Sequence, residues 1–215
     1  MKKLLLTAML LAMTNCLNAQ EKDEKFKLEK GTWALTGKFS LGSDRATFDS
    51  APDNESTRFN LNILPSAEYF ITDNLSIGLG LAYNYNESEF ESSSTNNVNI
   101  NNLYSVSSYI KKYVPVSKKL SFSLQGGLGY TYTDSKYISS QNDPSGSISN
   151  RYSITFRPGI TYLITDNLAF EANLGRLGYS HQNSRNKSSS DNAYEDSFDF
   201  DLKATNILFG LTFYL

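Results

Sequence analysis

The chain has 215 residues, a formal net charge of −2, one His and one Cys. This balance excludes the strongly basic surface that nucleic-acid binding requires, and the single His and Cys exclude most metal sites built on those residues. Thirteen Phe, fourteen Tyr and only five Pro favour β-strands over helices, and the length suits one all-β barrel.

The N-terminus has the pattern of a secretory signal peptide, predicted to span residues 1–19. Two lysines precede an apolar run at residues 4–13, and Ala19 is a small residue at the expected cleavage position. The apolar run is too short for a membrane-spanning helix. Cys16 keeps a lipoprotein signal open as an alternative, since such signals also place a Cys after the apolar run. Residues 20–31 are charged and aperiodic, and we expect a short, flexible periplasmic lead-in.

Eight segments with alternating apolar and polar residues follow and predict eight strands. They lie at about residues 32–41, 57–71, 75–85, 100–114, 120–132, 151–163, 168–174 and, for the last, up to residue 215. In the third segment, every second residue is apolar: Leu75, Ile77, Leu79, Leu81, Tyr83 and Tyr85. Because side chains alternate between the faces of a strand, this segment has one apolar face and one small, polar face. Aliphatic residues in the middle of the apolar face and aromatic residues at its end are typical of a strand that crosses a bilayer.

Several positions break this alternation. Pro65 predicts a bulge or a local break in strand pairing, since Pro has no N–H to donate. Ser108 and Lys112 fall on the presumed lipid face of the fourth strand, and the seventh becomes irregular at Gly175. In the last strand, the upstream aromatic residues have the opposite parity to the downstream ones, which predicts a bulge near residues 203–205.

The connections between strands alternate in length. Three are short, near Asp73, Ser117 and Asp166, and four are long, polar segments predicted to be loops, at residues 43–56, 87–99, 134–150 and 181–196. Short turns at one rim and long loops at the other indicate an all-β, eight-stranded, antiparallel up-and-down transmembrane β-barrel over residues 32–215. Strands can span a bilayer only as a closed barrel, and eight strands enclose a lumen wide enough only for side chains. The glycines at residues 78, 80, 126, 127 and 129 are expected to make room in this lumen.

The C-terminal residues Gly210-Leu-Thr-Phe213-Tyr-Leu215 resemble the signal on the last strand of outer-membrane barrels, with Gly followed by two spaced apolar residues. Leu208 departs from the polar residue usual there, and Leu215 replaces the commoner final Phe. With its strands placed, the chain resembles small Gram-negative outer-membrane barrels of the OmpA/OmpX type. The resemblance implies insertion by the outer-membrane assembly machinery, contact with outer-membrane lipid and lipopolysaccharide, and a monomer.

Five charged residues have lumen-facing parity: Lys38, Glu68, Lys111, Arg157 and Glu171. Because buried charges must be paired, we expect them to form an ion-pair network that fills the lumen. The alternative is a gated path for ions.

His181 and Ser184 bear on an enzymatic alternative. Some eight-stranded barrels modify lipid A with a His and a Ser separated by one residue at the rim, whereas here they are separated by two. On an extended strand they would lie on opposite faces, so His181 is expected to be a solvated loop residue. The acidic residues of the long loops have no calcium-loop spacing, and an extracellular ligand of these loops stays open.

The sequence thus favours a non-enzymatic outer-membrane barrel without a cofactor, which acts through a membrane-structural role or through its extracellular loops. Two alternatives remain: a narrow channel for small or hydrophobic solutes, and a lipid A-modifying enzyme.

Overall fold

The computed structural model describes residues 26–48, 51–92, 95–140, 145–187, 192–201 and 208–215. The predicted signal peptide, Cys16, the first part of the lead-in and the bulge predicted near residues 203–205 lie outside these ranges. Within them, no helix has the length and apolar character needed to cross a membrane.

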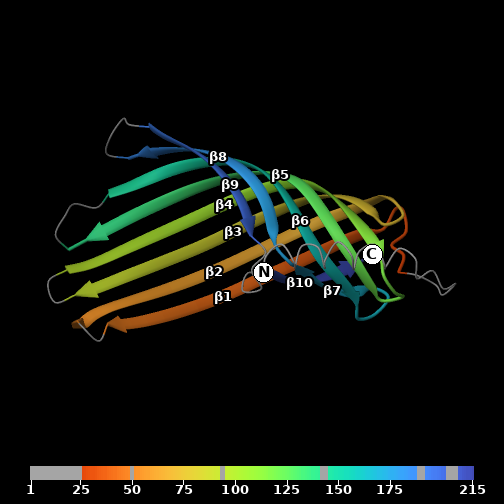
Figure 1. Ribbon diagram of the computed structural model, residues 1–215, viewed down its shortest axis with the longest axis horizontal. Helices are drawn as coiled ribbons and strands as arrows, with labels where there is room; N and C mark the ends of the chain where they lie inside the picture. Colours follow the sequence, from red (N-terminus) through yellow and green to blue (C-terminus); the bar gives the residue numbers. More distant parts are fainter. Residues whose placement is uncertain (1–25, 49–50, 93–94, 141–144, 188–191, 202–207) are drawn as a thin grey trace, which may run out of the picture.

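The described residues form strands that close into a ring (Figure 1). Consecutive strands from β1 to β7 pair antiparallel, and β10 pairs with both β7 and β1, so that eight strands complete the ring. This arrangement confirms the predicted antiparallel up-and-down barrel. The strand bounds are β1 Trp33–Phe48, β2 Ala51–Thr72, β3 Leu75–Ser92, β4 Thr95–Pro115, β5 Leu120–Ser139, β6 Ser145–Leu163, β7 Leu168–Asn173, β8 Arg176–Asn186, β9 Asn192–Asp201 and β10 Leu208–Tyr214.

Strands β8 and β9 continue the seventh and eighth strands away from the three short turns. We call the end with the short turns the turn end and the opposite end the hairpin end. Strand β6 pairs with β7 near the turn end and with β8 beyond it, and β8 pairs with β9. Gly159 lies opposite Asn173 whereas Phe156 lies opposite Leu177, so the seventh strand has one extra residue between β7 and β8. The predicted irregularity at Gly175 is therefore confirmed, and the outward parity changes from Phe170 to Leu177.

The predicted apolar faces point outward. The exposed large apolar side chains alternate along the wall, for example Trp33, Leu35, Phe39 and Leu41 on β1, Ile77, Leu79 and Leu81 on β3, Tyr104, Val106, Ile110 and Val114 on β4, and Tyr152, Ile154, Phe156 and Tyr162 on β6. Around Pro65, pairing of β2 with β3 skips two positions and resumes in the same register, from Ile63 opposite Tyr83 to Ser66 opposite Gly80. Pro65 therefore breaks the ladder without a bulge.

The four segments predicted as long loops are mostly strand. Strand β1 continues to Phe48 and β2 begins at Ala51, and the other three hairpins are extended in the same way. Strand β2 reaches 22 residues, about twice the 9–11 that a bilayer requires. The prediction of loops was wrong because polar residues on both faces of a segment indicate only that water lies on both sides of it. The backbone groups of two such segments can still pair as adjacent strands.

The lead-in is packed where the structure describes it, at residues 26–31. Phe26 and Leu28 are buried, and Leu28 exchanges hydrogen bonds with Asn74, donating to its Oδ1 at 2.8 Å and accepting from its N–H at 2.9 Å. The Phe26 N–H donates to the carbonyl of Ser117 at 3.0 Å. The expected flexibility is therefore wrong for these residues, because two apolar side chains at alternate positions find an apolar floor at the turn end.

Candidate functional site in the barrel lumen

Three of the five predicted lumen charges meet in one buried cluster. Glu68 of β2, Lys111 of β4 and Glu171 of β7 are only 2–3% exposed. The Lys111 Nζ lies 2.8 Å from both carboxylate oxygens of Glu171 and 3.2 Å from Oε1 of Glu68. The cluster therefore links three separate strands across the lumen.

Hydroxyl groups complete the hydrogen bonding of the cluster. Ser76 and Tyr113 donate to Oε2 of Glu68 at 2.7 and 3.0 Å, and Tyr109 donates to Oε1 at 3.2 Å. The Lys111 Nζ also lies 4.7 Å from the ring centroid of Tyr113, close enough for a cation–π interaction. Each charge thus has partners, as burial requires.

Gly78 makes the contact between Tyr109 and Glu68 possible. Strand register places Glu68, Gly78 and Tyr109 side by side on β2, β3 and β4. A Cβ at position 78 would lie 2.4 Å from Cζ of Tyr109, so the ring crosses the strand where no side chain is present. Gly78 makes room in the lumen, as expected from the sequence.

Below the cluster, a layer of aromatic side chains closes the turn end. Phe70 lies 5.5 Å from Tyr113 between ring centroids, and Phe26 lies 6.2 Å from Tyr113. Tyr214 packs against Phe70 at 6.2 Å. The sequence-based prediction missed Phe26, Phe70 and Tyr214 as lumen residues. Phe70 carried a usable signal, because it is an aromatic residue at lumen-facing parity beside a short turn.

On the hairpin side of the cluster, the lumen holds a polar cavity of about 700 Å³. Lys38 and Arg157 line it and are half-buried. Neither has an ion pair within 4 Å with a carboxylate of the part of the chain that the structure describes. The expected five-membered network thus contains three members, and the other two cations face the cavity.

The predicted assembly residues lie on the two faces of β10. Phe213 and Leu215 are exposed on the outer face, while Gly210 faces the lumen beside Lys38. A Cβ at position 210 would lie 2.6 Å from Cγ of Lys38. Gly210 therefore makes room for the Lys38 side chain, and its recognition by assembly machinery stays a prediction.

At the hairpin end, the described residues of β1 and β9 are not paired with each other. Strand β10 pairs with β1 only from Ala34 to Lys38, and within the described residues no Cα atom of β9 lies within 8 Å of one of β1. Figure 1 shows β1 and the β8–β9 hairpin on opposite sides of this end. We call this boundary between β1 and β9 the seam. Phe39 and Leu41 on β1 and Phe198 and Phe200 on β9 are exposed beside it.

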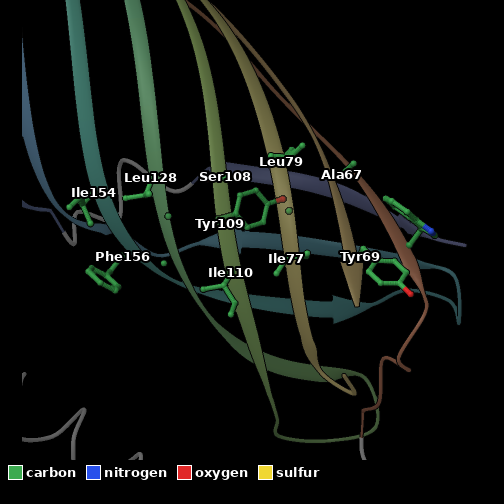
Figure 2. Close-up of a pocket in the computed structure, with 14 residues that line it drawn as sticks. Ala67, Tyr69, Ile77, Leu79, Ser108, Tyr109, Ile110, Leu128, Ile154 and Phe156 are labelled. Atoms are coloured by element: carbon green, nitrogen blue, oxygen red, sulfur yellow. The ribbon is translucent and has the colours of Figure 1, made fainter. Parts of the chain in front are cut away.

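The outer face of the wall has an apolar hollow of about 760 Å³ (Figure 2). Ser108 and Gly126 occupy outward positions between larger residues, and their small size leaves a depression in the outer surface. Ser108 lies on the outer face as predicted, whereas Gly126 does not face the lumen as expected. The rim is formed by Trp33, Tyr69, Ile77, Leu79, Ile110, Leu128, Ile154 and Phe156.

His181 lies in strand β8 and not in a loop. Its Nδ1 is 2.9 Å from Oδ1 of Asp196, which also accepts a hydrogen bond from Tyr179 at 2.7 Å. Ser184 accepts a hydrogen bond from the Gln182 amide at 2.9 Å, on the opposite face of the strand, as the spacing predicted. Ser184 is therefore not placed for deprotonation by His181. In the described ranges, no three His, Cys, Asp or Glu residues are grouped to hold a metal ion.

Comparison with known proteins identifies a family of barrels. The family model described as outer membrane protein beta-barrel domain matches residues 7–214. No curated protein matches the chain in sequence. Among solved structures, the chain is similar to the outer membrane protein OprG from Pseudomonas aeruginosa, with 12% identity, coverage of 87% of this chain and 97% of that one, and a TM-score of 0.49. A major outer membrane protein from Thermus thermophilus has 9% identity, coverage of 86% and 99%, and a TM-score of 0.48. Ail of Yersinia pestis has 14% identity, coverage of 86% and 99%, and a TM-score of 0.41.

Proposed function

We propose that this chain, which belongs to the outer membrane protein β-barrel domain family, is a non-enzymatic barrel whose lumen is closed at the turn end. It lies in the outer membrane, with its apolar outer face in lipid. On this proposal the turn end faces the periplasm, and the barrel acts through the hairpins that project from the cell. Contact with lipopolysaccharide, recognition of Gly210, Phe213 and Leu215 by assembly machinery, and a monomeric state belong to the same proposal.

One observation carries this proposal: the Glu68–Lys111–Glu171 cluster and the aromatic layer block the lumen in series. A hydrated ion would have to separate Lys111 from two carboxylates and then pass Phe70 and Tyr113, which are fully buried. Breaking a buried ion pair costs about 3–5 kcal/mol before any desolvation of the ion. The barrel is therefore expected not to conduct ions.

Single-channel recording in planar bilayers tests this closure. The wild-type protein should give no steady current steps at modest voltage. A variant that lacks residues 20–31 and carries Tyr113→Ala and Lys111→Ala should conduct, because both barriers are weakened. Lys112→Ala, on the exposed face of the same strand, is the matched control. Stable steps from wild-type protein would contradict the proposal.

The placement of His181 supports a non-enzymatic role. Its ring is oriented by Asp196, but the hydroxyl of Ser184 lies on the other face of β8. Without a nucleophile beside the base, lipid A modification has no support in this geometry. Lipid A from a deletion strain should match that of the wild type by mass spectrometry.

The seam favours a second candidate function, the passage of small or hydrophobic solutes through the wall. The cavity of about 700 Å³ could admit a small solute without opening the turn end. Uptake of a hydrophobic dye by a deletion strain, with and without the complementing chain, separates the two functions. The second function predicts faster uptake on complementation, and the first predicts no difference.

A further inference from the structure

The cavity on the hairpin side of the cluster has an excess of positive charge. Its lining includes four cationic side chains, Lys38, Arg151, Arg157 and Arg176, and two carboxylates, Glu68 and Asp199. Both carboxylates already have cationic partners, since Glu68 binds Lys111 at 3.2 Å and Asp199 binds Arg176 at 2.9 Å. Among the described residues, neither Lys38 nor Arg157 has a carboxylate within 4 Å. Lys38 is attracted to Glu171 at longer range, whereas Arg157 has no such acidic partner.

Lys38 is attracted to Glu171 and repelled by Lys111 and Arg157. The lining of the cavity carries more cations than carboxylates, and burial of this excess charge is unfavourable, so an anion bound in the cavity would lower the cost. The Lys38 side chain lies over Gly210 inside the lumen, where a Cβ would lie 3.1 Å from Cε. The site is therefore built into the wall and does not depend on flexible surface lysines.

We propose that Lys38 and Arg157 bind an oxyanion, a carboxylate or a phosphate group, inside the hairpin half of the lumen. Arginine suits this role because its planar guanidinium donates two parallel hydrogen bonds to such groups. The amides of Gln125 and Asn173 line the same cavity and supply neutral donors. Gln125 lies directly opposite Arg157 in the pairing of β5 with β6.

Two sources could supply this group. A free oxyanion would enter from the hairpin end, whereas the head of an anionic amphiphile would enter from the lipid side, between β1 and β9. In the second case, Phe39, Leu41, Phe198 and Phe200 flank the path that an alkyl chain would take toward the outer leaflet. The site binds its anion whether or not the turn end conducts ions, so it stands apart from the proposed function.

Isothermal titration calorimetry tests the site, with protein purified from outer membranes and placed in phosphatidylcholine nanodiscs. Inorganic phosphate and decanoate are the two probes. Binding should weaken about tenfold or more in Lys38→Gln and in Arg157→Gln, because each removes one charge from a desolvated contact. The double variant should show no binding. Lys112→Gln removes the same charge from the outer face and should bind as wild type does.

The two probes distinguish the sources. Phosphate that binds as well as decanoate indicates a free oxyanion, and a marked preference for decanoate indicates an amphiphile whose chain lies in the seam. The heat-dependent shift on gels guards against misfolding: Lys38→Gln and Arg157→Gln should both keep this shift while binding is weakened. Absence of binding of both probes to wild type, or equal binding by the double variant, would overturn the site.

Discussion

The two ends of the barrel differ in how their charges and backbone groups are satisfied. At the turn end the ring is closed, Glu68, Lys111 and Glu171 are paired, and Phe26 covers an aromatic layer. At the hairpin end the described residues of β1 and β9 are not paired, and Lys38 and Arg157 face a cavity. The comparison indicates that stability is concentrated at the turn end, and that binding capacity lies at the hairpin end.

Replacing Lys111 tests the turn end most severely. Lys111→Met leaves two carboxylates buried side by side, and loss of one partner of a buried ion pair costs about 3–5 kcal/mol. Reversible urea unfolding in lipid vesicles measures the free energy of unfolding. The matched variant Lys112→Met changes an exposed neighbour, and its effect should stay within about 0.5 kcal/mol. Equal effects of the two variants would remove the distinction between the cluster and the surface.

A methyl group at position 78 tests whether close packing contributes beyond charge. Gly78→Ala would place Cβ 2.4 Å from the Tyr109 ring and displace its hydroxyl from Glu68. Such overpacking costs about 1–3 kcal/mol. Gly37→Ala is the control, because nothing lies within 4 Å of a Cβ there. The same unfolding titration compares them, and a neutral Gly78→Ala would show that the ring has room to move.

At the hairpin end the equivalent loss of a cation should not destabilise the barrel. Arg157→Met removes a half-buried charge that has no carboxylate partner among the described residues. The free energy of unfolding without added anion should therefore stay within about 0.5 kcal/mol of wild type or rise. A loss as large as that of Lys111→Met would show that Arg157 has a structural partner and that the two ends are alike.

The sequence was sufficient to predict the barrel because a period of two is a local property. Strands such as 75–85 show it within eleven residues, and the short turn near Asp73 fixes the next strand's direction. The sequence predicted that Glu68, Lys111 and Glu171 face the lumen, because they lie at the polar positions of the alternating pattern. Their grouping without Lys38 and Arg157 could not be predicted, because it depends on register between strands distant in sequence.

The lead-in and the seam were missed for related reasons. Phe26 and Leu28 stand among charged residues, and only the apolar floor formed by Phe70 and Tyr214 gives them a place. The exposed apolar residues of β9 lie at even positions and those of β10 at odd positions, and the described part of β9 does not pair with β1. The sequence showed the parity change but not its effect on pairing with β1. The length of the hairpins was underestimated because strands outside the lipid are polar on both faces, so apolar and polar residues do not alternate along them.

The smallest expected effect concerns how the lead-in is held at the turn end. The Lys30 N–H donates to Asp73 at 3.0 Å, and the Lys27 ammonium lies 3.2 Å from the same carboxylate. The backbone hydrogen bond from Lys30, and then Lys27, lower the pKa of Asp73 below its ordinary value. A lowered pKa in the folded state means that Asp73 stabilises the docked lead-in above its ordinary pKa. That contribution is lost as the pH falls through the lowered value.

The amide resonance of Lys30 should therefore shift on acidification. Asp73→Asn should abolish this shift while the barrel stays folded, since Leu28 remains bonded to Asn74. A Lys30 amide that titrates identically in the variant would mean that Asp73 does not hold the lead-in, and that burial of Phe26 and Leu28 alone closes this end.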